Sequence, residues 1–117
     1  MRKVGIEAAT RNAVDHLRRP ELEGFFIHLD ADCLDDSIMP AVDFRVPGGL
    51  SWDELGTALR IAMASGKAVG IEVTIYNPRL DGDGSAGRGL ADMLAATLGT
   101  AAPWHREPTR SDRRQAI

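Results

Sequence analysis

Two aspartates at the end of a short apolar segment are the residues of this sequence best suited to chemistry. Asp30 and Asp32 follow an apolar run that begins at Phe25, and its aromatic and β-branched start is typical of a buried strand. Because side chains two apart in a strand point the same way, we expect His28, Asp30 and Asp32 to share one face, with the aspartates about 7 Å apart. Two poorly solvated carboxylates repel each other unless a cation or strong donors offset the cost. The pattern predicts a divalent metal site.

A long loop follows these aspartates and leads into a helix. Residues 33–47 carry acids, a serine and prolines, and a connection of about fifteen residues is longer than a compact domain usually needs. Loops of this kind are often functional. Ser51 and Glu54 have the spacing of a capping box, which predicts a helix start, and Gly66 is a natural end for that helix.

The other elements alternate in a way that favours an α/β fold. We expect a helix over 7–19, strands over 25–31 and 68–76, and a last helix over 88–98. Helical crossovers make neighbouring strands parallel, and sites in such sheets lie at the carboxyl ends of the strands. We therefore predict one α/β domain over 1–99 and a flexible polar tail over 100–117.

Composition excludes several classes of partner. The 117 residues include 14 basic and 17 acidic side chains, with no basic stripe among aromatic residues, so nucleic acid is not expected as a partner. No apolar run reaches the roughly 18 residues of a membrane span, and the N-terminal residues lack the apolar core of a signal peptide. The single cysteine, Cys33, agrees with a reducing compartment. We expect a cytoplasmic protein, and the sequence is compatible with a homo-oligomer.

Several motifs together resemble one enzyme family. An Asp-x-Asp-x-x-Asp pattern runs from Asp30 to Asp35 and is followed by Met39-Pro40-Ala41, by the segment 47–50, Pro-Gly-Gly-Leu, and later by Asn77-Pro78. This arrangement resembles the ureohydrolase family of arginases and agmatinases. The likeness extends over about 8–99, which is most of the chain.

The resemblance implies a fold, a metal and a reaction. The family has a three-layer α/β/α fold and two manganese ions, which activate a water for attack on the guanidinium carbon of a linear amidine and so release urea. By position, Asp30 would bridge both ions and Asp32 would bind one of them, with oxygen ligands that suit manganese. Asp35 would shape the loop through an Asx-type turn. His28 would support Asp30 through a hydrogen bond, and we weigh it less as a direct ligand.

Two departures from the family pattern bear on activity. The other metal ligands of the family lie upstream, in Gly-Gly-Asp-His and Asp-x-His-x-Asp segments, and neither segment occurs in this sequence. We expect the chain, which resembles only the C-terminal part of a subunit, to bind a divalent ion weakly and to hold no working pair alone. Ile75 stands where the family has the glutamate that receives the guanidinium, and Glu72 stands where it has a nearby aspartate. Either the substrate differs, or Glu72 takes over part of that binding, or Glu72 is an ordinary strand residue.

Three interpretations follow from the sequence. The first is a manganese-dependent amidine hydrolase whose missing ligands come from elsewhere, with a small guanidino compound as substrate. The second is a non-catalytic remnant or interaction fragment of the same fold, whose open sheet edge would promote association. The third is a phosphotransferase or glycosyltransferase with one magnesium or manganese ion. Against it, Leu34 lies where dehalogenase-like phosphatases have a hydroxyl side chain.

Overall fold

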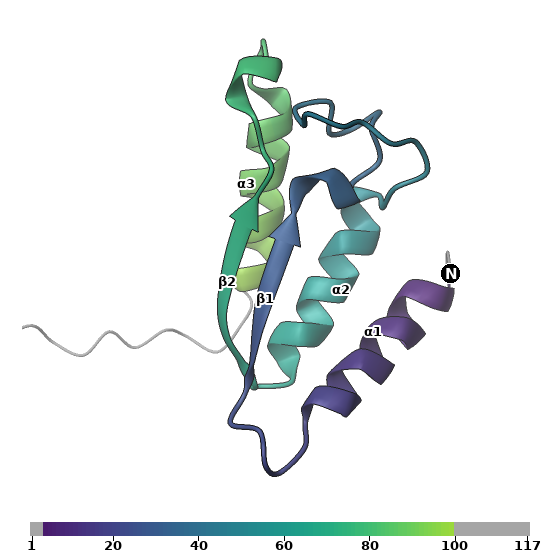
Figure 1. The fold of residues 1–117 in the computed structure, drawn as a ribbon, viewed down its shortest axis with the longest axis vertical. Helices are drawn as coiled ribbons and strands as arrows, with labels where there is room; N and C mark the ends of the chain where they lie inside the picture. Colours follow the sequence, from purple (N-terminus) through teal and green to yellow (C-terminus); the bar gives the residue numbers. More distant parts are fainter. Residues whose placement is uncertain (1–3, 100–117) are drawn as a thin grey trace, which may run out of the picture.

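The computed structural model describes residues 4–99, which form three helices and a two-stranded sheet (Figure 1). The predicted tail lies outside the described residues. In chain order the elements are helix α1 (Val4–Leu17), strand β1 (Phe25–Asp30), 3₁₀ turn η1 (Ala31–Cys33), helix α2 (Trp52–Ala64), strand β2 (Ala68–Thr74), 3₁₀ turn η2 (Pro78–Leu80) and helix α3 (Ser85–Leu98).

All five predicted helices and strands are present, with ends that differ by a few residues. Helix α1 begins and ends earlier than the predicted 7–19, β2 ends two residues before the predicted 76, and α3 begins three residues before the predicted 88. The predicted capping box of α2 is confirmed. The Ser51 hydroxyl accepts from the backbone N–H of Glu54 at 3.1 Å, and the Glu54 carboxylate accepts from the backbone N–H of Ser51 at 3.0 Å.

The two strands pair in parallel, which confirms the predicted α/β class. The register places His28 opposite Glu72 and Asp30 opposite Thr74. Figure 1 shows both arrowheads at the same end of the molecule, with α2 and α3 behind the strands and α1 beside α2. The carboxyl ends of β1 and β2 therefore share one edge of the fold, as a parallel sheet requires.

The core lies between the sheet and helices α2 and α3. Leu29 of β1 packs there with side chains of both helices, and the loop after β1 adds Met39, whose exposed fraction is 0%. Within residues 4–99 the helices cover this face of the sheet, while the opposite face exposes Phe26, His28 and Glu72. Of a three-layer arrangement, the described residues thus form the sheet and one helical layer. No helix in the described part of the chain has the length and apolar content of a membrane span.

Candidate functional site

The two predicted metal ligands lie in different secondary structure. Strand β1 ends at Asp30, and Asp32 belongs to the 3₁₀ turn η1. The expectation that both aspartates continue one strand face was therefore wrong. The reason is the backbone: the N–H of Leu34 bonds the carbonyl of Ala31 at 3.2 Å, so the alternation of a strand stops at Asp30. Asp32 is half-buried and makes no side-chain hydrogen bond or ion pair to another described residue.

Asp30 is held at the edge of the sheet by its two neighbours. The Thr74 hydroxyl donates to its Oδ1 at 2.5 Å, and His28 Nε2 lies 2.6 Å from the same atom. Both contacts use Oδ1, so Oδ2 takes part in neither. The hydrogen bond from Thr74, followed by the contact with His28, keeps the pKa of the Asp30 carboxyl below its ordinary value. The predicted contact between His28 and Asp30 is present. That His28 orients Asp30 as a metal ligand stays a prediction.

His28 also binds a second carboxylate that sequence reasoning did not assign to it. Its Nδ1 forms a short hydrogen bond with Glu72 Oε1 across the strand pair. This bond first, and then the contact with Asp30, raises the pKa of His28 above its ordinary value. The signal for the pairing was the parallel register, which places residues 28 and 72 side by side. Glu72 is therefore held on the sheet face by His28.

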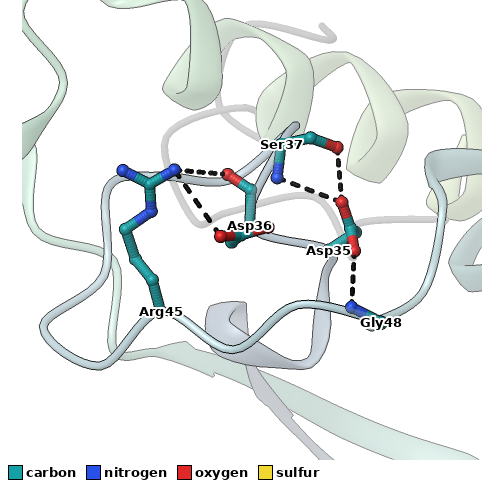
Figure 2. Close-up of polar contacts among 5 residues, drawn as sticks. All are labelled: Asp35, Asp36, Ser37, Arg45 and Gly48. Carbon is teal, nitrogen blue, oxygen red and sulfur yellow. Dashed lines mark hydrogen bonds and ion pairs between the residues drawn. The ribbon is translucent and has the colours of Figure 1, made fainter.

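The loop after β1 is closed by Asp35 (Figure 2). Its Oδ2 accepts from the backbone N–H of Ser37 at 3.1 Å and from the Ser37 hydroxyl, while its Oδ1 accepts from the backbone N–H of Gly48 at 2.8 Å. These bonds, the Ser37 hydroxyl first, lower the pKa of Asp35 to about 2. Arg45 donates to the Asp36 carbonyl at 3.2 Å, and its Nη2 lies 3.7 Å from the Asp36 carboxylate. The predicted Asx-type turn is confirmed.

The same loop is tied to the segment after β2. The Asn77 side-chain amide donates to Asp43 at 3.0 Å, and the Asn77 backbone N–H donates to the Ala41 carbonyl at 2.8 Å. Neighbouring Phe44 is largely exposed, with an exposed fraction of 82%. The two connections that leave the carboxyl ends of the strands are therefore fastened to each other.

Asp81 anchors the second connection to helix α3. The Tyr76 hydroxyl donates to its Oδ2 at 2.5 Å, and the backbone N–H groups of Ala86 and Gly87 donate at 3.1 and 2.8 Å. The bond from Tyr76 and the bond from Gly87 lower the pKa of Asp81. A side chain at residue 87 would collide with the Tyr76 hydroxyl, because its Cβ would lie 2.5 Å from that oxygen. The sequence alone did not predict this anchor.

Ile75 has an unusual backbone conformation beside these anchors. Its φ is 76°, and it is the one non-glycine residue of the described part with a positive φ. For a β-branched residue this conformation is a rare outlier that costs about 1–3 kcal/mol. The predicted strand 68–76 includes Ile75, but β2 ends at Thr74, and 46% of Ile75 is exposed. Bonds made by Thr74 on one side and Tyr76 on the other hold it in place.

The types of the two candidate ligands suit manganese, but their number is too small for a complete metal site. Asp30 and Asp32 supply carboxylate oxygens, which hard divalent ions and manganese accept. Within residues 4–99, however, no three or more histidine, cysteine, aspartate or glutamate side chains form a group that could hold a metal ion. The described part of the chain thus offers two candidate ligands of a larger set.

Comparison with known proteins assigns the chain to a family. The family model described as the arginase family matches residues 1–101. The chain belongs to the arginase family. An arginase of Brucella melitensis is 35% identical over 85 residues, which are 71% of this chain and 28% of that protein. An arginase of Staphylococcus aureus is 27% identical over 97 residues, which are 83% of this chain and 32% of that protein. The chain therefore spans less than a third of the length of these relatives.

Several solved structures have the same fold as this member of the arginase family over the part that they share. An arginase of Bacillus subtilis superposes with a TM-score of 0.73 at 26% identity, over 86% of this chain and 34% of that one. A formimidoylglutamase of Bacillus subtilis superposes with a TM-score of 0.62 at 33% identity, over 67% of this chain and 24% of that one. The arginase of Bacillus caldovelox, with a TM-score of 0.75 at 23% identity over 86% of this chain and 33% of that one, supports the fold alone.

Proposed function

We propose that this chain is part of a manganese-dependent hydrolase that cleaves a C–N bond of a linear amidine. The observation that carries the proposal is the position of Asp30. It ends β1 beside Thr74, at the sheet edge where parallel α/β proteins bind ligands, in a chain of the arginase family. The similar arginase and formimidoylglutamase are named for different substrates, so their names support the reaction class more than a particular compound.

In this proposal each chemical task belongs to a named side chain. Asp30 and Asp32 would hold manganese, which when bound polarises a water and the substrate and so assists hydrolysis. His28 would orient Asp30, since its Nε2 lies 2.6 Å from Asp30 Oδ1. Glu72 would act through His28, because its carboxylate is bonded to the histidine ring. Asp35 would keep the loop in the shape that positions Asp32.

We infer that the ligand set is completed by residues outside the described part of the chain. The support is the donor count, since two carboxylates do not make the metal-binding group that the reaction needs. The same count favours a second candidate, a non-catalytic fragment of the arginase fold. The two differ in one outcome: only the hydrolase gains amidine hydrolysis when it is co-expressed with the part of the Brucella melitensis arginase that it does not match.

Manganese titration of the chain by calorimetry tests the metal half of the proposal. We expect weak binding that falls at least tenfold in Asp30→Ala and in Asp32→Ala. Asp53→Ala is the matched control, because Asp53 is an exposed aspartate at the start of α2 and its loss removes the same charge. Binding that stays unchanged in both the Asp30 and the Asp32 variants would refute the assignment.

A further inference from the structure

We propose that Thr74 is a positioning residue of the candidate metal site, which occupies one oxygen of the Asp30 carboxylate and so leaves the other oxygen, Oδ2, to bind the ion. This inference rests on the proposed function, since it takes Asp30 as a metal ligand. It goes beyond that function by assigning a task to the strand residue opposite Asp30 and by naming the oxygen that would face the metal.

The backbone places the Thr74 hydroxyl against Asp30. Thr74 is the last residue of β2, and the parallel register puts it directly opposite Asp30, the last residue of β1. A β-branched side chain has few rotamers about its first side-chain bond. The 2.5 Å hydrogen bond from the Thr74 hydroxyl to Asp30 Oδ1 is therefore made by a side chain with little freedom to turn away.

Two contacts fill the acceptor sites of Asp30 Oδ1. Besides the Thr74 hydroxyl, His28 Nε2 lies 2.6 Å from this atom. An ionised carboxylate has about four acceptor sites, shared equally between its two oxygens. Oδ1 is therefore saturated while both contacts hold. No hydrogen bond or ion pair within residues 4–99 involves Oδ2, so Oδ2 is the oxygen that can take an ion.

Thr74 holds Asp30 more firmly than His28 does. The histidine is shared between Asp30 and Glu72, and 53% of its side chain is exposed. Thr74 is half-buried, and the one acceptor of its hydroxyl within the described residues is Asp30. Loss of the Thr74 hydroxyl would free an acceptor site on Oδ1 and remove the contact that fixes the carboxylate.

The expected consequence is a change in metal preference. With Oδ1 occupied, Asp30 offers one oxygen to an ion, and with Oδ1 released it can offer two. Ca²⁺ accepts carboxylates through one or both oxygens in flexible geometry, whereas Mn²⁺ is typical of octahedral sites with oxygen ligands. An aspartate restricted to one oxygen therefore favours manganese, and a released aspartate shifts the preference toward calcium.

Substitutions at Thr74 test this inference in the full chain, titrated with Mn²⁺ and separately with Ca²⁺ while NMR follows the backbone amide resonances. Thr74→Val keeps the branched shape and removes the hydroxyl. We expect the affinity for Mn²⁺ to fall about tenfold, as is typical when a hydrogen-bonding partner of a metal ligand is lost, and the affinity for Ca²⁺ to fall less. Thr74→Ser retains the donor and should keep both affinities.

A matched control separates this task from the loss of any hydroxyl. Thr10→Val removes a hydroxyl that donates to the Ile6 carbonyl at 2.6 Å in α1, and it should leave both affinities unchanged. Unchanged affinities in Thr74→Val, or an equal loss for the two ions, would overturn the inference. Thr74→Ala gives the same test if urea unfolding shows that Thr74→Val does not fold.

Failure of the proposed function has a different result. Manganese binding by the natural chain would then be absent or independent of Asp30 and Asp32, and the inference would fall with it. If the inference alone is wrong, binding still depends on both aspartates, and the calcium-to-manganese preference stays the same without the Thr74 hydroxyl.

Discussion

The connections that leave the carboxyl ends of β1 and β2 use the same device and differ in strain. Each is fixed by an aspartate that accepts backbone N–H groups: Asp35 accepts from residues that include Ser37 and Gly48, and Asp81 accepts from Ala86 and Gly87. The first connection adds buried apolar side chains and, within the described residues, has no non-glycine residue with a positive φ. The second contains the strained Ile75.

This difference indicates that the two connections support the candidate site in different ways. The first connection packs into the core, and Asp32 lies in the chain between the buried residues Ala31 and Leu34. The second packs less well, because Leu80 and Ile75 are about half exposed, although Tyr76 packs against the core; hydrogen bonds supply the rest of its support. The candidate ligands Asp30 and Asp32 therefore lie at the end of β1 and at the start of a well-packed connection, whereas Ile75 lies in a connection held mainly by polar contacts.

The largest expected effect comes from the core side chain of the first connection. Met39 has an exposed fraction of 0%, so Met39→Ala should lower the free energy of unfolding by about 2–5 kcal/mol through lost contacts and a cavity. Leu80→Ala, in the second connection, is the matched variant. With 48% of Leu80 exposed, its cost should stay below about 1 kcal/mol. Urea unfolding measures both, and equal losses would contradict the contrast in packing.

A smaller effect of opposite sign should come from relieving the strain at Ile75. Glycine adopts a positive φ without steric cost, so Ile75→Gly should raise the free energy of unfolding by about 1 kcal/mol, reduced by the entropy that glycine adds to the unfolded chain. Ile71→Gly, in the interior of β2, should instead be destabilising because the backbone there is extended. Thermal unfolding compares the two. A loss of stability in Ile75→Gly would mean that its side chain contributes more than its backbone costs.

The elements and the first connection could be predicted from the sequence because their signals are local. The capping box of α2 involves residues three apart, and the Asx-type turn at Asp35 involves residues two apart. The pairing of His28 with Glu72 spans 44 positions and becomes visible only through the strand register. The positive φ of Ile75 has no sequence signal at all, since a β-branched residue predicts an extended backbone there.

The Asp81 anchor shows the same limit. Its partners Tyr76 and Gly87 lie five residues before it and six after it, on either side of a turn whose shape the sequence leaves open. The displacement of Asp32 from the strand face has a related cause, because the 3₁₀ turn depends on how the following loop packs through Leu34 and Leu50. The contact between His28 and Asp30 was therefore predictable from their spacing, whereas the placement of Asp32 and Asp81 was not.

The smallest expected effect is a pH dependence that belongs to the first connection. Folding lowers the pKa of Asp35 from 3.8 to about 2, because the ionised carboxylate accepts hydrogen bonds from Ser37 and Gly48 that form only in the folded loop. The stability that this carboxylate contributes is therefore complete above its unfolded pKa and is lost as the pH falls through about 2. Asp35→Asn should flatten the decline of the unfolding midpoint over this interval, while Asp53→Asn, which removes the same charge from an exposed position, should leave the decline unchanged. If the unfolding midpoint of both variants declines as it does in the natural chain, the hydrogen bonds of Asp35 contribute no net stability. The first connection would then be stabilised by the packing of Met39 and its neighbours alone.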